Sequence, residues 1–223
     1  MRVASGWRLL IGGTFVSLEL TQQPRIARLN TDGTLDATFS VGAGPNGAVQ
    51  QIAVQPDGRI MIAGSFTTVA GAARAGLARL MSNGSLDTSF VPPASWTIRR
   101  FALQNDGRVV VATAPTSSVR RLLATGAEDT TFTTVPFNGL IDVMRLQSND
   151  RVLVGGNFSM SGSTAVNQLV RVFTNGGLDT TFAAGSGYPT ALSVNPDDKI
   201  MVGGGFSSWG GVSRSRAARI LSN

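Results

Sequence analysis

Short apolar runs recur along the whole chain, and each is ended by a sequence typical of a tight turn. Residues 49–54 form one such run, which stops at Pro56-Asp57-Gly58, and a second β-rich run follows directly at residues 59–63. Asp-Gly between two such runs indicates a β-hairpin, because both residues tolerate a positive φ angle. The pattern therefore predicts two antiparallel strands over residues 49–63.

A Gly- and Ala-rich loop then leads to a third apolar run at residues 77–81. Asn83-Gly84 predicts a second hairpin, after which residues 86–90 form a short fourth strand or turn. No apolar pattern with a period of 3.6 residues persists past the Gly and Pro positions, so the sequence predicts no helix of useful length.

Two motifs built from these runs recur in the same order five times. The first is a turn, a basic residue and an apolar run that ends in small residues; its basic residues are Arg8, Arg59, Arg108, Arg151 and Lys199. The second is Arg-apolar, a Gly turn and Asp-x-Thr/Ser-Phe; its arginines are Arg28, Arg79, Arg121, Arg171 and Arg219, and the fifth copy stops at Asn223.

The arginines of the second motif recur at a mean spacing of about 48 residues, and a period of this size made of strands and tight turns is typical of a β-propeller. We therefore expect an all-β fold in which one β-propeller domain spans residues 1–223. We expect five blades of four antiparallel strands, with the first and last repeats incomplete.

The Arg and Asp of the second motif are eight residues apart in all four complete copies. Folding the hairpin brings the two side chains nearly opposite each other, within reach of a bidentate ion pair. The Phe that follows is expected to pack between blades. Because a feature repeated in every unit holds the unit together, we predict four structural pairs: Arg28/Asp36, Arg79/Asp87, Arg121/Asp129 and Arg171/Asp179.

Composition removes several kinds of chemistry. The chain has no His and no Cys. A Ser-His-Asp triad, imidazole acid–base catalysis, His or thiolate metal ligands and disulfides are therefore excluded. Paired carboxylates remain, as in glycosidases, but few acidic residues lie outside the repeat pattern: Glu19, Glu128 and Asp142. We expect no enzyme activity, no cofactor and no metal.

The net charge of +6 comes mostly from arginines at repeat positions. Nucleic-acid binding needs a contiguous basic stripe with stacking aromatic residues, and the few aromatics here fall mainly in the Phe positions of the motifs. No stretch approaches the 18 apolar residues that a transmembrane helix requires. We therefore expect neither nucleic-acid binding nor membrane insertion.

Departures from the repeat indicate where a ligand could bind, because one ligand needs unlike groups in one place. Several such residues lie where the chain enters the first strand of a repeat or in the loop after the second strand. Aromatic and polar side chains on a loop-rich rim are typical of carbohydrate and peptide sites. The candidate residues are Asn46, Trp96, Arg99, Asn138, Asp142, Tyr188, Thr190 and Trp209.

The unit from Arg28 to Phe66 carries the residues that point to a family. It contains Arg-Leu-Asn-x-Asp-Gly-x-Leu-Asp-x-Thr-Phe and, further on, Val-Gln-Pro-Asp-Gly-Arg-Ile-x-Ile-x-Gly-x-Phe. These motifs resemble the delta-60 repeat of bacterial β-propeller proteins, over essentially the whole chain. The third unit departs from the pattern at residues 112–115. The resemblance implies a propeller in large, often secreted or surface-attached bacterial proteins, without catalytic residues.

These observations predict a non-enzymatic binding or scaffold module of a cell-surface, secreted or phage virion protein. Its partner would be a protein or a glycan, and no signal peptide is visible in this chain. One alternative is a lectin that uses Trp96 and Tyr188. A less favoured alternative is a glycoside hydrolase that uses Glu19 or Asp142.

Overall fold

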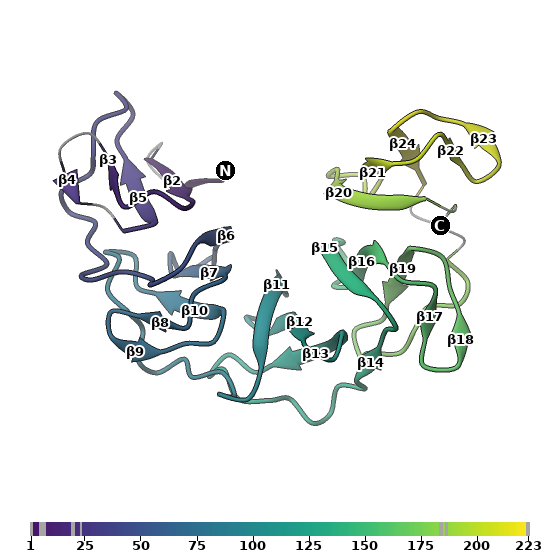
Figure 1. Cartoon of the computed structure of the whole chain (residues 1–223), viewed down its shortest axis with the longest axis horizontal. Helices are drawn as coiled ribbons and strands as arrows, with labels where there is room; N and C mark the ends of the chain where they lie inside the picture. Colours follow the sequence, from purple (N-terminus) through teal and green to yellow (C-terminus); the bar gives the residue numbers. More distant parts are fainter. Residues whose placement is uncertain are drawn as a thin grey trace. The chain divides into compact units, whose positions relative to one another are not determined.

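The computed structural model describes residues 2–4, 8–18, 21–22, 24–182, 185 and 187–221, so Glu19 and Asn223 lie outside the described residues. Within these ranges every regular element is a β-strand (Figure 1). The chain divides into two compact units. Unit 1 comprises Met1–Arg99 and Leu123–Glu128, and unit 2 comprises Arg100–Leu122 and Asp129–Asn223.

The described residues form five larger antiparallel sheets, numbered here along the chain. Sheet 1 contains β1 (Arg2–Ala4), β2 (Arg8–Gly12) and β5 (Ile26–Leu29), and sheet 2 contains β6 (Val49–Val54), β7 (Ile60–Gly64) and β10 (Leu77–Leu80). Sheet 3 contains β11 (Thr97–Leu103), β12 (Val109–Ala114), β13 (Ser118–Leu122) and β14 (Val135–Pro136). Sheet 4 contains β15 (Leu140–Leu146), β16 (Val152–Asn157) and β19 (Leu169–Val172), and sheet 5 contains β20 (Tyr188–Val194), β21 (Ile200–Gly205) and β24 (Ala217–Ile220).

Four two-stranded hairpins lie in the loops between the second and third strands of sheets 1, 2, 4 and 5. They are β3 (Ser17–Leu18) with β4 (Thr21–Gln22), β8 (Thr68–Val69) with β9 (Ala72–Ala73), β17 (Met160–Ser161) with β18 (Thr164–Ala165), and β22 (Ser208–Trp209) with β23 (Val212–Ser213). The loop of the third repeat is shorter, so β12 turns directly into β13.

The predicted fourth strand of each repeat is a turn. Residues after the second hairpin continue the ladder by a single isolated bridge, as between Leu80 and Leu86 or between Val172 and Leu178. The chain then turns away because the Asp87 carboxylate accepts hydrogen bonds from the backbone N–H and hydroxyl of Ser89. The expectation of four strands in every repeat is thus corrected to three, and sheet 3 gains its fourth strand, β14, from the segment that follows.

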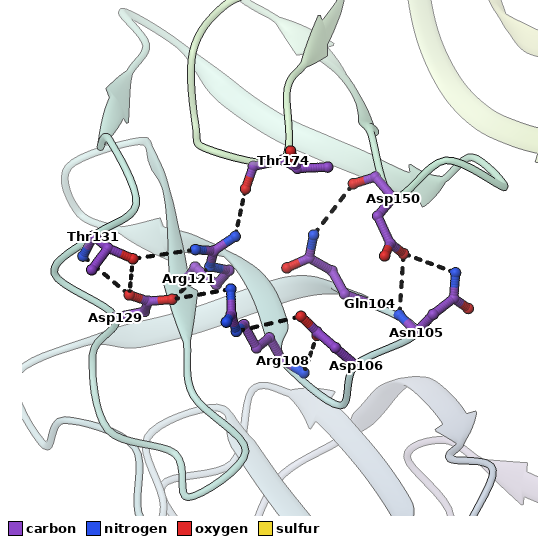
Figure 2. Close-up of polar contacts among 9 residues, drawn as sticks. All are labelled: Gln104, Asn105, Asp106, Arg108, Arg121, Asp129, Thr131, Asp150 and Thr174. Carbon is purple, nitrogen blue, oxygen red and sulfur yellow. Dashed lines mark hydrogen bonds and ion pairs between the residues drawn. The ribbon is translucent and has the colours of Figure 1, made fainter.

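The tight turns between first and second strands need a residue with positive φ, and the repeats supply it in two ways. Gly58 and Gly107 have φ of 82° and 84°, whereas Asp150 and Asp198 take the same place with φ of 62° and 60°. The Asp150 carboxylate accepts hydrogen bonds from the backbone N–H and the amide of Asn105 in the preceding repeat, at 3.1 and 2.9 Å (Figure 2). In unit 2, then, Asp at this position links successive turns.

All four predicted Arg–Asp pairs are present. The Nε–Oδ2 distances are 2.7 Å for Arg28–Asp36 and Arg79–Asp87, and 2.8 Å for Arg121–Asp129 and Arg171–Asp179. Both partners of every pair are at most 8% exposed.

The pairs are not bidentate as the spacing suggested, since the guanidinium divides its donors among three acceptors. In the pair drawn in Figure 2, Nε of Arg121 binds Asp129, Nη1 donates to the Thr174 carbonyl of the next repeat, and Nη2 lies 3.5 Å from the Thr131 hydroxyl. The second carboxylate oxygen of Asp129 accepts from the N–H and hydroxyl of Thr131. Arg28, Arg79 and Arg121 each donate in this way to a carbonyl of the following repeat, so these three pairs fix their own turns and also contact the next repeat.

The Phe of each second motif completes this arrangement. The guanidinium carbon lies 4.6–4.8 Å from the ring centroid in the four pairs Arg28/Phe39, Arg79/Phe90, Arg121/Phe132 and Arg171/Phe182. In unit 1, Phe39 packs with residues of sheets 1 and 2, and in unit 2 Phe132 packs with residues of sheets 3 and 4. These contacts agree with the expected position of the Phe between successive sheets.

Removing one carboxylate should therefore cost much more stability than removing an exposed one. We expect Asp129→Ala to destabilise the protein by about 3–5 kcal/mol, because it leaves the buried Arg121 charge without its partner. Asp106→Ala is the matched control, since the Arg108–Asp106 pair is 41% and 48% exposed, and should cost at most about 1 kcal/mol. Urea unfolding monitored by tryptophan fluorescence measures both, and equal losses would contradict the structural role of the pair.

The same carboxylates predict how stability depends on pH. Burial alone would raise the pKa of Asp36, but hydrogen bonds from Thr38 and Arg28 outweigh burial and lower that pKa to about 2. The pKa values of Asp87, Asp129 and Asp179 are lowered in the same way. Stability supplied by a lowered carboxyl pKa is complete above the unfolded value of about 3.9 and is lost as pH falls toward the folded value.

We therefore expect the urea midpoint to stay nearly constant from pH 7 to about 5 and to fall steeply between about pH 4 and 2. In Asp129→Ala the fall should be smaller, because one of the contributing groups is missing. A midpoint that does not change down to pH 2.5 would show that these ion pairs add no stability.

Candidate functional site

The first strands of three sheets share a β-bulge at the same repeat position. The register shifts between Val49 and Gln51 in β6, between Ile141 and Val143 in β15, and between Pro189 and Ala191 in β20. A bulge leaves one residue out of the ladder and redirects its side chain, and bulges are frequent beside functional sites. The bulged residues are Gln50, Asp142 and Thr190.

Asp142 is a bulged residue with polar contacts to two neighbouring strands. It lies in unit 2 on β15, beside β20. Its backbone carbonyl accepts a hydrogen bond of 2.7 Å from Nε of Arg100 on β11. Its carboxylate accepts a hydrogen bond of 2.9 Å from the Tyr188 hydroxyl on β20. The bulge thus brings side chains of three first strands to one residue.

The charges around Asp142 affect one another. The hydrogen bond to Asp142, with partial burial and the carboxylate charge, raises the pKa of Tyr188. On the same strand as Asp142, partial burial and the nearby Arg100 charge lower the pKa of Arg145. Two guanidinium groups, one carboxylate and one phenol therefore gather on these strands. We call Arg100, Asp142, Arg145 and Tyr188 the first-strand cluster.

This cluster contains two of the predicted ligand residues, Asp142 and Tyr188, and two that the sequence analysis did not select. Arg100 and Arg145 are common residue types at ordinary strand positions, and they are connected to this place only by the hydrogen bond from Arg100 to Asp142 and by the charge of Arg100 near Arg145. Thr190 is exposed on β20, the strand that carries Tyr188. In the sequence, Asp142 and Thr190 are connected only by the repeat position that they share, which indicates no shift of register.

Asn46 and Asn138 hold loops in place. The Asn46 amide oxygen accepts hydrogen bonds from the N–H groups of Thr67 and Thr68, at 2.8 and 3.0 Å. The Asn138 oxygen accepts equivalent bonds from Ser159 and Met160, both at 3.0 Å. These bonds stabilise the starts of β8 and β17, so neither Asn belongs to the first-strand cluster.

The remaining candidates are aromatic or basic. Trp209 is only 5% exposed and packs against Phe206 in the core shared by sheets 4 and 5, with ring centroids 5.0 Å apart. Its burial makes it a core residue rather than part of a ligand-binding rim. Trp96, which is half-buried, and Arg99, which is exposed, belong to unit 1.

Of the two other acids that lie outside the repeat pattern, Glu128 belongs to unit 1 and Glu19 lies outside the described residues. Within the same part of the chain, no group of three or more acidic side chains is positioned to hold a metal ion. The described residues also include no helix that is long and apolar enough to cross a membrane.

Tyr188 is the only tyrosine in the chain, so its ionisation can be measured directly. We expect the absorbance at 295 nm to report a pKa above the ordinary value of about 10. Asp142→Asn should move that pKa back toward 10, because it removes the carboxylate charge that disfavours the phenolate. An identical titration in both proteins would show that the hydrogen bond between Asp142 and Tyr188 is absent in solution.

Comparison with solved structures supports a propeller fold. The chain is similar to a protein of unknown function from Bacteroides caccae, with 15% identity and a TM-score of 0.55 over 88% of this chain and 64% of that one. It is also similar to a catalytically inactive virginiamycin B lyase from Staphylococcus aureus bound to quinupristin, with 14% identity and a TM-score of 0.54 over 89% and 60%.

A third similar structure is the extracellular domain of a one-component system from B. thetaiotaomicron, with 15% identity and a TM-score of 0.53 over 89% and 25%. The chain thus spans less than two thirds of the length of each of these proteins. At such identities the likeness is one of fold alone. No curated protein sequence matches the chain.

A family model gives the more specific result. It matches residues 8–39, 55–90, 147–182 and 195–223, which together cover more than half of the chain. These four segments begin at or shortly before the basic residue of the first motif, and they omit the third unit, where the motif departs from the pattern. The chain belongs to the family described as a domain of unknown function (DUF5122) β-propeller.

Proposed function

We propose that this chain is a non-enzymatic binding module, a single propeller domain of five blades that serves a cell-surface, secreted or virion protein. The observation that carries the proposal is the contact of Arg100 and Tyr188 with Asp142 at a β-bulge. The Arg–Asp pairs recur in every complete repeat and explain the fold. The contacts of Arg100 and Tyr188 with Asp142 lie at one bulge of the described residues and therefore distinguish that repeat from the others. Five larger sheets support the blade number.

The composition of the first-strand cluster supports a polar ligand that carries an anionic group. Arg100 and Arg145 supply two positive charges against the one negative charge of Asp142, so the cluster keeps a net positive charge. The Asp142 carboxylate and the Tyr188 ring and hydroxyl add an acceptor and an apolar face, which is the combination that sugar-binding sites use. Carbohydrate binding is therefore the second candidate function, with a carboxylate-bearing glycan as its ligand.

An array of neutral and acidic glycans tests this function. We expect selective binding of acidic glycans, weakened at least tenfold by Arg100→Gln and by Tyr188→Phe and unchanged by Ser193→Ala, which alters an exposed residue on the same strand as Tyr188. Glycan binding that neither cluster variant weakens would refute this site. Absence of binding to every glycan on the array would refute carbohydrate binding, and release of free sugar would refute the non-enzymatic role.

A further inference from the structure

Arg145 on β15 carries a charge that the repeat does not explain. The basic residues of the two motifs lie near a buried carboxylate, as Arg151 and Arg171 lie near Asp179. Arg145 belongs to neither motif, and in the part of the chain that the structure describes it forms no ion pair. It is an exposed residue, so a molecule in solution can reach it.

Arg145 and Arg100 are both held by backbone carbonyls of β15. The Asp142 carbonyl accepts a hydrogen bond of 2.7 Å from Nε of Arg100, and the Met144 carbonyl accepts one of 2.8 Å from Nη1 of Arg145. β15 is an edge strand of sheet 4, and carbonyls two residues apart on a strand point to the same side of it. Two residues of a strand span about 6–7 Å. The two guanidinium groups therefore lie close together along one edge of β15.

The two positive charges affect each other. Partial burial of the side chain and the nearby Arg100 charge lower the pKa of Arg145. Like charges held close together repel, and an anion that binds both of them offsets the repulsion. A guanidinium presents its N–H donors as a planar fork that matches the oxygens of an oxyanion. The pair therefore has the charge and the donors that an oxyanion requires.

The side chain of Asp142 is directed to a different partner. Arg100 binds the backbone carbonyl of Asp142, whereas the Asp142 carboxylate accepts a hydrogen bond of 2.9 Å from the Tyr188 hydroxyl. The first-strand cluster therefore divides into two parts. One part consists of the two guanidinium groups beside the strand edge, and the other consists of the carboxylate and the phenol.

We propose that Arg100 and Arg145 form the subsite that binds the oxyanion group of the ligand, while Asp142 and Tyr188 contact its neutral hydroxyl groups. This assignment rests on the proposed function of the first-strand cluster. It names a glycan in which a carboxylate or a sulfate ester lies beside a free hydroxyl group. Arg145 is the residue that determines specificity for the acidic group, because Arg100 also holds the bulge through the Asp142 carbonyl.

Simple anions test the subsite without a glycan. The whole chain is titrated with sodium acetate or sodium sulfate at constant ionic strength, and the Nε–H signals of Arg100 and Arg145 are followed by NMR. We expect saturable shifts of both signals, with a dissociation constant on the order of a few millimolar for at least one of the two anions. The anion that binds more tightly indicates whether the subsite prefers a carboxylate or a sulfate ester.

Three variants make the titration specific. Arg145→Gln should weaken the binding followed at Arg100 at least fivefold. Arg214→Gln is the matched control, since Arg214 is also exposed and its Nη1 also donates to the carbonyl of the preceding residue, at 2.9 Å. It should leave anion binding within about twofold. Asp142→Asn should strengthen anion binding about threefold, because a carboxylate about 7 Å away repels the anion in water.

Anions that shift neither signal, or that bind Arg145→Gln as tightly as the unaltered chain, would overturn the subsite. The glycan array distinguishes this result from failure of the proposed function. Binding of acidic glycans that Arg145→Gln does not weaken would overturn the subsite while glycan binding stands. Anion shifts at Arg145 without binding of any glycan would indicate an adventitious ion only and would overturn the assignment as well.

Discussion

The buried carboxylate of the second motif is the contact on which each repeat depends. In the copies at Asp36, Asp87 and Asp129, one oxygen binds a buried arginine, the other closes the local turn, and the same arginine donates to a carbonyl in the next repeat. A buried ion pair is no more stabilising than a well-packed apolar cluster of the same volume. Its advantage here is geometric, because directional bonds tie the turn of one repeat to a backbone carbonyl in the following turn.

The same carboxylates account for much of the positive charge. Each of the four buried carboxylates also lies near the basic residue of the first motif in its own repeat. The Nε–Oδ2 distance is 3.3 Å for Arg8–Asp36 and 3.5 Å for Arg59–Asp87. In each complete repeat two basic residues thus share one carboxylate, and these three groups together carry a charge of +1. The four complete repeats therefore supply +4 in this way, so much of the net charge of +6 has a structural origin.

The repeated features could be predicted from sequence because local chemistry determines them. Asp57-Gly58 specifies its hairpin through its φ preferences, and the spacing of Arg121 and Asp129 places them opposite each other across a turn. The bulge at Asp142 could not be predicted, because a ladder shift by one residue depends on pairing with β16 and leaves no composition signal. Trp209 was assigned to a rim because sequence does not distinguish an aromatic side chain on a loop from one that packs back into the core.

Function in a repeat protein is expected where one copy differs from the others, and Asp142 is such a place. Three first strands share the bulge, but at Asp142 the bulged residue is an acid whose carbonyl and carboxylate accept hydrogen bonds from Arg100 and Tyr188 on neighbouring strands. The equivalent residues Gln50 and Thr190 carry no charge, so the change of one side chain at a shared position introduces a carboxylate without altering the ladder. The Arg–Asp pairs lie elsewhere in the repeat, so one copy can vary at the bulge without loss of the contacts that hold its fold.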